Sequence, residues 1–156
     1  MLRPMSEATR LAVDELLRAN REFYRAFASG DFVAMDRVWS DHLEILCMHP
    51  GWELLRGRDR VMASWRGILR RPTPVRFRDQ VVELLGEVAV VACVEVLPEA
   101  ELAATNVFVR EEGRWRMLHH QAGLIARSIA DQDEDDEDDE DDDIRGGGSG
   151  GGRMLN

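Results

Sequence analysis

The sequence predicts a single α+β domain in which helices cover one face of an antiparallel sheet. Two observations lead to this fold class. Apolar residues recur with helical spacing over most of residues 6–70, whereas residues 75–126 divide into strand-like runs joined by very short turns. The chain has 156 residues, which is enough for one domain with a hydrophobic core of its own.

Three helices are expected in the first half of the chain. The first helix has apolar residues at i, i+3 and i+4, and Asn20 is the one polar member of that stripe. Gly30 is a favourable helix stop, and Asp31 is a favourable N-cap for the helix that follows. Pro72 and Pro74 end the third helix. The predicted helices span residues 6–29, 32–39 and 58–70.

Five strands are expected, one before the third helix and four after it. Gly86-Glu87 and Glu112-Gly113 are two-residue connections, and such short turns join consecutive antiparallel strands. The four strands after Pro74 therefore form a meander. The predicted strands span residues 43–49, 75–85, 88–97, 101–111 and 114–126.

The turns suggest a register for the meander. Counting back from the last turn places Asn106 opposite His119, and the earlier turns place Cys93 opposite Asn106 and Arg78 opposite Glu95. A slip of one residue would move every side chain to the other face, so this register is a hypothesis.

In this register one sheet face grades from apolar to polar, as a cavity with a polar mouth would. Successive strand residues point to opposite faces, so His119 and His120 cannot act as a pair. We expect His119 to point into the cavity and His120 toward the flatter, subunit-contacting face. Three rows cross the cavity face. The apolar row is Val82, Val91, Phe108 and Met117, the next row is Gln80, Cys93, Asn106 and His119, and the most polar row is Arg78, Glu95, Ala104 and Gln121.

The charge of the chain is concentrated in one segment. Residues 131–143 hold 12 acids in 13 positions, whereas residues 1–130 hold 18 acids and 18 arginines. A neutral domain without a basic stripe is a poor nucleic-acid binder, and no run approaches the ~18 apolar residues of a membrane span. Residues 131–156 are therefore expected to form a disordered acidic and Gly/Ser-rich tail after a domain at 1–130.

The basic residues and cysteines exclude several chemistries. All 20 basic residues are arginine, so neither a Schiff-base lysine nor a phosphate-binding Walker lysine exists in this sequence. Cys47 and Cys93 are too few for a disulfide framework or a CxxC zinc site. We expect free thiols, a cytoplasmic location and no cofactor.

With these elements placed, the chain resembles the nuclear transport factor 2-like superfamily, in its SnoaL-like branch. The resemblance rests on "FYRAFASGDFVAMDRVWSDH" (23–42), "CMHPGWELLRGRDRVMASWRGIL" (47–69) and "ATNVFVREEGRWRMLHHQ" (104–121). It implies a cone-shaped α+β barrel, in which a curved sheet wraps around a pocket closed by helices, and a homodimer through the sheet. The superfamily includes isomerases, dehydratases and polyketide cyclases as well as a non-catalytic kinase association domain, so the fold does not determine function.

Candidate site residues follow from the register and the resemblance. His119 with Asn106 is the candidate polarising pair, and His49 is a second polar group that could instead bond turn backbone. Glu95 beside Arg78 could be a proton carrier, although an ion pair with structural function is the alternative. A metal site formed by His49, His119 and Cys93 is conceivable, but the spacing of these residues in the sequence matches no metal-binding motif. The expected pocket residues are Trp52, Trp65, Cys93, Gln80, Glu95, Arg78, Tyr24, Phe108 and Met117.

Two functions remain open at this point. The first is a small-molecule pocket protein, with isomerase-, dehydratase- or cyclase-like activity on an apolar ligand that carries oxygen. The alternative is a non-catalytic dimerisation or association module, with the acidic tail as an arm that binds a partner.

Overall fold

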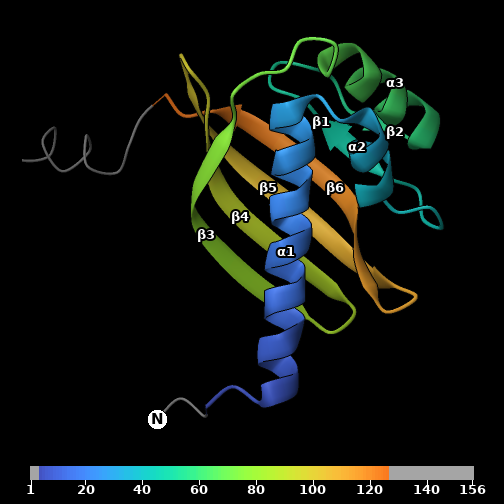
Figure 1. Cartoon of the computed structure of the whole chain (residues 1–156), viewed down its shortest axis with the longest axis vertical. Helices are drawn as coiled ribbons and strands as arrows, with labels where there is room; N and C mark the ends of the chain where they lie inside the picture. Colours follow the sequence, from blue (N-terminus) through green and yellow to red (C-terminus); the bar gives the residue numbers. More distant parts are fainter. Residues whose placement is uncertain (1–3, 127–156) are drawn as a thin grey trace, which may run out of the picture. The chain divides into compact units, whose positions relative to one another are not determined.

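The computed structural model describes residues 4–126 and shows three helices packed on a six-stranded sheet (Figure 1). The predicted acidic tail and the domain boundary at residue 130 lie outside the described residues. The helices are α1 (Glu7–Ser29), α2 (Phe32–Val38) and α3 (Arg58–Ile68). The strands are β1 (Leu46–Met48), β2 (Leu55–Arg56), β3 (Arg76–Leu85), β4 (Val88–Val96), β5 (Glu101–Glu111) and β6 (Arg114–Leu124).

The strand order of the sheet is β2-β1-β6-β5-β4-β3. The long meander β3 to β6 is antiparallel, as predicted, and α1 crosses its inner face (Figure 1). The α+β class with a curved sheet is thus confirmed. Two features were not predicted: the short strand β2, and the parallel pairing of β1 with β6, which makes the sheet mixed.

Local signals set the ends of the helices. The Ser6 hydroxyl accepts a hydrogen bond from the Thr9 amide at 3.1 Å, and the Asp31 carboxylate accepts one from the Ala34 amide at 3.0 Å. Gly30 ends α1 with φ 67°, and a Cβ there would lie 2.8 Å from the Leu69 carbonyl oxygen. Glycine is therefore required both by the left-handed backbone and by the approach of the α3 end.

The two faces of the sheet differ in burial. Residues of β4 alternate strictly, so that Ala89, Val91, Cys93 and Glu95 are buried, while the residues between them are half-buried. We call the face against α1 the inner face and the opposite one the outer face. The inner face carries Phe77, Gln80, Val82, Ala89, Val91, Cys93, Glu95, Leu102, Ala104, Asn106, Phe108, Met117, His120 and Ala122.

A β-bulge in β6 overturns the predicted position of the two histidines. Near the turn the predicted pairs Glu111–Arg114 and Phe108–Met117 are confirmed. Leu118 is then an extra residue, so Val107 faces His119 and Asn106 faces His120. The prediction that His119 is the inward histidine is therefore wrong: His120 is inward and 1% exposed, whereas His119 lies on the outer face.

A second irregularity, in β3, separates Arg78 from Glu95. The predicted pair Val82–Val91 is confirmed, but the register shifts between Arg78 and Val81, and Asp79 adopts φ 57°. Phe77 rather than Arg78 consequently faces Glu95, so the predicted pairing of Arg78 with Glu95 is wrong. The predicted pairing of Cys93 with Asn106 is also wrong, because Asn106 faces Val91 and the observed register of β4 against β5 differs from the predicted one by two residues. A shift by an even number of residues leaves each side chain on its face, so Cys93 and Asn106 both remain on the inner face.

Candidate functional site

Six polar or ionisable side chains meet on the inner face beneath α1. Helix α1 supplies two of them, and β4, β5 and β6 supply the other four, so the group assembles only when the helix lies on the sheet. Each is at most 6% exposed. This inner polar cluster consists of Asn20, Tyr24, Cys93, Glu95, Asn106 and His120.

Asn106 sets the tautomer of His120. The Asn106 Nδ2 donates to Asn20 Oδ1 at 2.8 Å and to the Tyr24 hydroxyl at 3.2 Å, which leaves Oδ1 as the atom that faces His120. His120 Nδ1 lies 2.6 Å from that oxygen and must carry the proton, because an amide oxygen only accepts. The Nε2 of neutral His120 is therefore unprotonated and can accept a proton.

Tyr24 joins Glu95 to the rest of the cluster. Its hydroxyl donates to Glu95 Oε1 at 2.9 Å and lies 3.3 Å from the Cys93 sulfur. Because the single hydroxyl proton is directed to Glu95, the Cys93 thiol is the donor in the second contact. Asn20 extends the network outward by donating to Gln80 Oε1 at 3.0 Å.

Burial favours the neutral forms of the ionisable groups. Desolvation raises the pKa of Glu95 to about 7, and the hydrogen bond from Tyr24 opposes part of that rise. Desolvation also lowers the pKa of His120 to about 3, with the nearby imidazoles of His49 and His119 adding to the effect. Burial raises the pKa of the Cys93 thiol and of the Tyr24 phenol, so both keep their protons at neutral pH.

The carboxyl group of Glu95 lies beside the free nitrogen of His120. Glu95 Oε1 lies 3.8 Å from His120 Nε2. That separation is too long for a direct hydrogen bond, and at neutral pH the imidazole is neutral, so the contact is not a fixed ion pair. A carboxyl whose pKa lies near 7 can both give up and take a proton.

His49 occupies a separate position beside α3. The Ser64 hydroxyl donates to the Val61 carbonyl at 2.7 Å, so His49 Nε2, 2.8 Å from the same hydroxyl, must be the donor in that contact. The His49 ring packs against Trp52 and Trp65, with centroids 4.9 and 4.8 Å away. Burial lowers the pKa of His49 to about 4, so it is a neutral group held in place by Ser64.

The structure gathers some predicted pocket residues and disperses others. Glu95, Cys93, Tyr24 and Asn106 are together in the cluster, and Phe108 and Met117 are fully buried on the same face. Trp65 is fully buried, 6.0 Å from the His120 ring, whereas Trp52 is 52% exposed. Arg78 is exposed and bonds Glu101 and Asp79.

Asn20 and His120 are the members of the cluster that sequence reasoning missed, His120 because the bulge in β6 turns it inward. The signal of Asn20 was present as the one polar residue in the apolar stripe of α1, which indicates a buried partner. The considered metal site of His49, His119 and Cys93 does not form, because His119 and Cys93 lie on opposite faces. Within residues 4–126 no three His, Cys, Asp or Glu side chains are placed to hold a metal ion.

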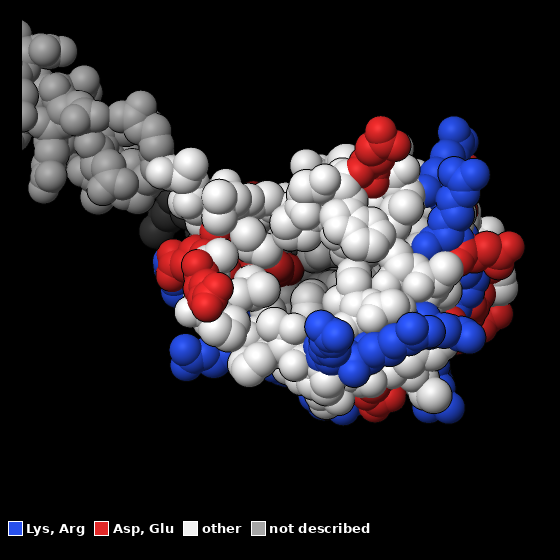
Figure 2. Space-filling model, turned by 90° about the horizontal axis from the view of Figure 1, so that it is seen from above, with Lys and Arg blue, Asp and Glu red and all other residues white. Residues whose placement is uncertain are grey.

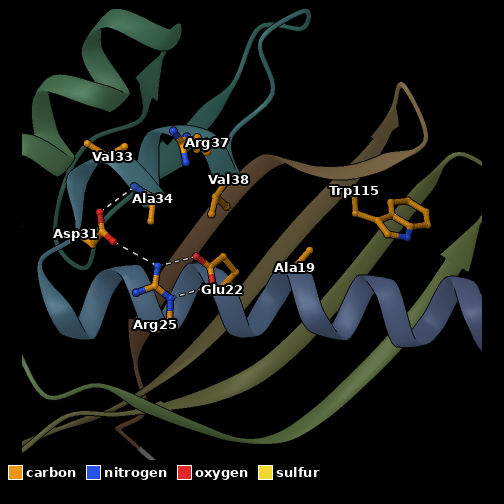
Figure 3. Close-up of a pocket in the computed structure, with 9 residues that line it drawn as sticks. All are labelled: Ala19, Glu22, Arg25, Asp31, Val33, Ala34, Arg37, Val38 and Trp115. Atoms are coloured by element: carbon orange, nitrogen blue, oxygen red, sulfur yellow. Dashed lines mark hydrogen bonds and ion pairs between the residues drawn. The ribbon is translucent and has the colours of Figure 1, made fainter.

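Among the described residues several surface grooves run along α1, and two of them bear on the candidate site. The groove between α1 and α2 has a volume of about 350 Å³, and its Arg25 is engaged by Glu22 and Asp31 (Figure 3). The groove between α1 and β3 has a volume of about 630 Å³ and includes Tyr24 of the cluster. From the end uppermost in Figure 1, the surface is hollowed between uncharged residues, with charged side chains around the hollow (Figure 2).

No helix among the described residues combines the length and the apolar composition that a membrane crossing requires.

Comparisons with solved structures place this fold among known ones. A candidate dehydratase of the NTF2-like family from Streptomyces avermitilis is 27% identical, with 76% of this chain and 99% of that chain covered and a TM-score of 0.71. A candidate calcium/calmodulin-dependent protein kinase type II association domain from Thiobacillus denitrificans is also 27% identical, with coverages of 69% and 92% and a TM-score of 0.62.

Sequence comparison gives a relative and a family. The F-box protein SKIP8 of Arabidopsis thaliana is 27% identical over 114 residues, which cover 70% of this chain. The match spans 49% of the length of that F-box protein, about half. The SnoaL-like domain family matches residues 16–127, most of the sequence, and the chain therefore belongs to that family, within the nuclear transport factor 2-like superfamily.

Proposed function

We propose that this protein binds an apolar, oxygen-bearing small molecule against the inner face of its sheet and that Glu95 exchanges a proton with it. The observation that carries the proposal is the buried pair of Glu95 and the unprotonated nitrogen of His120, 3.8 Å apart. A carboxyl with a pKa of about 7 is suited to proton transfer at neutral pH. The likeness to a candidate dehydratase supports the same chemistry.

The surrounding groups have distinct roles in this proposal. Glu95 in its ionised form removes a proton from the carbon next to a carbonyl and, once protonated, returns a proton to that carbon. His120 stays neutral and keeps its unprotonated Nε2 beside the carboxyl group. Asn106 is a positioning residue, because its amide fixes the His120 tautomer. The buried Trp65 indole nitrogen has no hydrogen-bond partner among the described residues and is an available donor for the ligand oxygen, whereas the Tyr24 hydroxyl donates its single proton to Glu95.

The test is carbon-bound proton exchange in an apolar ketone. We expect the protein to accelerate deuterium uptake at the carbon next to the carbonyl of 2-tetralone in D2O, followed by NMR. The rate should rise as pH increases through about 7, because the base is the ionised Glu95. Glu95→Gln should lower the rate by about 100-fold or more, since a general base contributes on that order.

Glu83→Gln is the matched control. Glu83 lies on the exposed outer side of β3, so its loss should leave the exchange rate unchanged. A wild-type rate no higher than that of buffer, or equal rates for the two variants, would refute the proposal.

We also propose that two copies associate through the outer face of the sheet. The outer residues of β4 are Val88, Val90, Ala92, Val94 and Val96, all half-buried, and Val81 of neighbouring β3 is 60% exposed. This apolar row on β4 is typical of the centre of an interface, and the charged Arg76, Arg78 and Glu83 of β3 lie beside it. The likeness to a candidate kinase association domain further favours association of two copies. The alternative function is assembly of this kind without catalysis.

The predictions about cellular location, partners and the acidic tail remain part of this proposal. Cys47 and Cys93 are both unpaired and buried, which fits the reducing conditions of a cytoplasmic location. We also propose that residues 1–130 form the domain and that it binds neither nucleic acid nor membrane. Residues 131–156 are then an acidic arm.

A further inference from the structure

The groove between α1 and β3 combines positive charge with an apolar floor. Its rim carries four arginines, Arg18, Arg21, Arg25 and Arg76, and a single carboxylate, Glu22. The deeper lining is apolar or aromatic and includes Val75, Tyr24 and Phe77. Such a composition suits a ligand with an apolar body and a negative end.

Three of the four arginines are available to a ligand. Arg25 is bound by Glu22 and Asp31, with nitrogen–oxygen distances of 2.6 and 3.3 Å. Arg18, Arg21 and Arg76 are exposed and have no carboxylate within 4.0 Å among residues 4–126.

The spacing of these arginines raises the charge density of the groove. Arg18, Arg21 and Arg25 follow one another at i, i+3 and i+7 on α1, so like charges lie on one side of the helix. Like charges at this spacing repel, and a bound anion would relieve that repulsion. The groove between α1 and α2 differs, because its carboxylates Glu22 and Asp31 already hold Arg25 (Figure 3).

Tyr24 links the groove to the inner polar cluster. Its ring lines the groove and packs on Phe77, with centroids 4.7 Å apart. Its hydroxyl points the other way, to Glu95 at 2.9 Å. A ligand lying on the Tyr24 and Phe77 rings is thus one side chain away from the carboxyl group, and the guanidinium groups stand at the outer end.

We infer that the groove between α1 and β3 is a binding site for an oxyanion carried by an apolar small molecule. Arg21 and Arg76 hold the oxyanion, Arg18 adds to the positive field, and Tyr24 and Phe77 contact the apolar body. The inference rests on the proposed function in that it names the class of ligand that approaches the inner polar cluster, from the groove that Tyr24 shares with it. The oxyanion is a carboxylate or a phosphate, since arginine binds both.

The test uses three probes with one naphthalene body, measured by isothermal titration calorimetry on the full chain. The probes are 2-naphthoate, 2-naphthyl phosphate and the uncharged 2-naphthamide. We expect at least one anion to bind about tenfold tighter than the amide, and we expect added salt to weaken that preference because the arginines are exposed. The tighter anion identifies the oxyanion.

Variants assign the preference to the groove. In the double variant Arg21→Gln/Arg76→Gln the preference should fall below about threefold, whereas Arg60→Gln on the exposed side of α3 should keep it. Equal binding of anions and amide by the wild type, or a preference that survives in the double variant, overturns the inference. All substituted arginines are exposed, and circular dichroism checks that each variant folds.

Glu95→Gln separates this inference from the proposed function. The variant should still prefer the anion, because Glu95 is buried and does not line the groove. Anion preference without 2-tetralone exchange in the wild type would refute only the proton-transfer chemistry. Exchange without anion preference would refute only the groove assignment.

Discussion

The inner and outer faces of the sheet are built from the same strands, yet they differ in which polar groups they bury. The inner face buries an amide, a carboxyl and an imidazole, which hydrogen bonds satisfy, whereas the outer face presents valines and threonine to the solvent. His120 and His119 are adjacent in the sequence and fall on different sides of this division. The comparison shows that position relative to the helix, rather than residue type, decides which of the two histidines joins the inner polar cluster.

The two histidines offer the largest contrast in stability. His120→Ala should lower the free energy of unfolding by about 3 kcal/mol, because it leaves a cavity and removes the partner of Asn106. His119→Ala on the half-exposed outer face should cost less than about 1 kcal/mol. Urea denaturation measures both, and equal losses would contradict the division between the faces.

The pH dependence of stability sharpens the contrast at Glu95. Its pKa is raised from 4.5 to about 7 on folding, so it contributes stability below pH 4.5 that is lost as pH rises through about 7. At 1.36 kcal/mol per unit, that loss amounts to roughly 3 kcal/mol. Glu95→Gln should therefore gain stability relative to the wild type over this pH range. Urea denaturation across the range checks the trend, and a difference that stays constant with pH would contradict buried protonation.

The outer face can be tested by charge. Ala92→Asp should weaken dimerisation by at least about tenfold, since an aspartate between the uncharged Val81 and Thr105 at the centre of the interface loses its hydration. Light scattering at several protein concentrations measures the effect, with Glu83→Gln as a variant on the same face that keeps the size of the side chain. A wild type that stays monomeric at all concentrations would remove the outer face from consideration as an interface.

The smallest effect is expected where a predicted site residue proved to be a surface group. Arg78 is paired with Asp79 and Glu101, and its side chain is 48% exposed. Arg78→Ala should change the free energy of unfolding by less than about 1 kcal/mol, because exposed ion pairs contribute little. A loss comparable to that of His120→Ala in the same denaturation series would show that the edge strand depends on this pair.

The arrangement of helices and meander strands could be predicted because its signals are local. The cap residues Ser6 and Asp31 and the stop at Gly30 act within one turn of their helices. The two-residue turn before Arg114 fixes the pairs closest to it, and Phe108 indeed faces Met117. Strand β2, only two residues long, carries no such signal.

The sequence by itself determined the three helices, the four meander strands with their hairpin order, and the presence of a polar group within an apolar setting at Asn20. Only the tertiary structure decided that His120 rather than His119 meets Asn106, and that Phe77 rather than Arg78 faces Glu95. The physical reason is that one extra residue in a strand reverses every side chain beyond it. Where the strands of a curved sheet accept that extra residue depends on how they pack around α1, and this packing joins residues far apart in the chain.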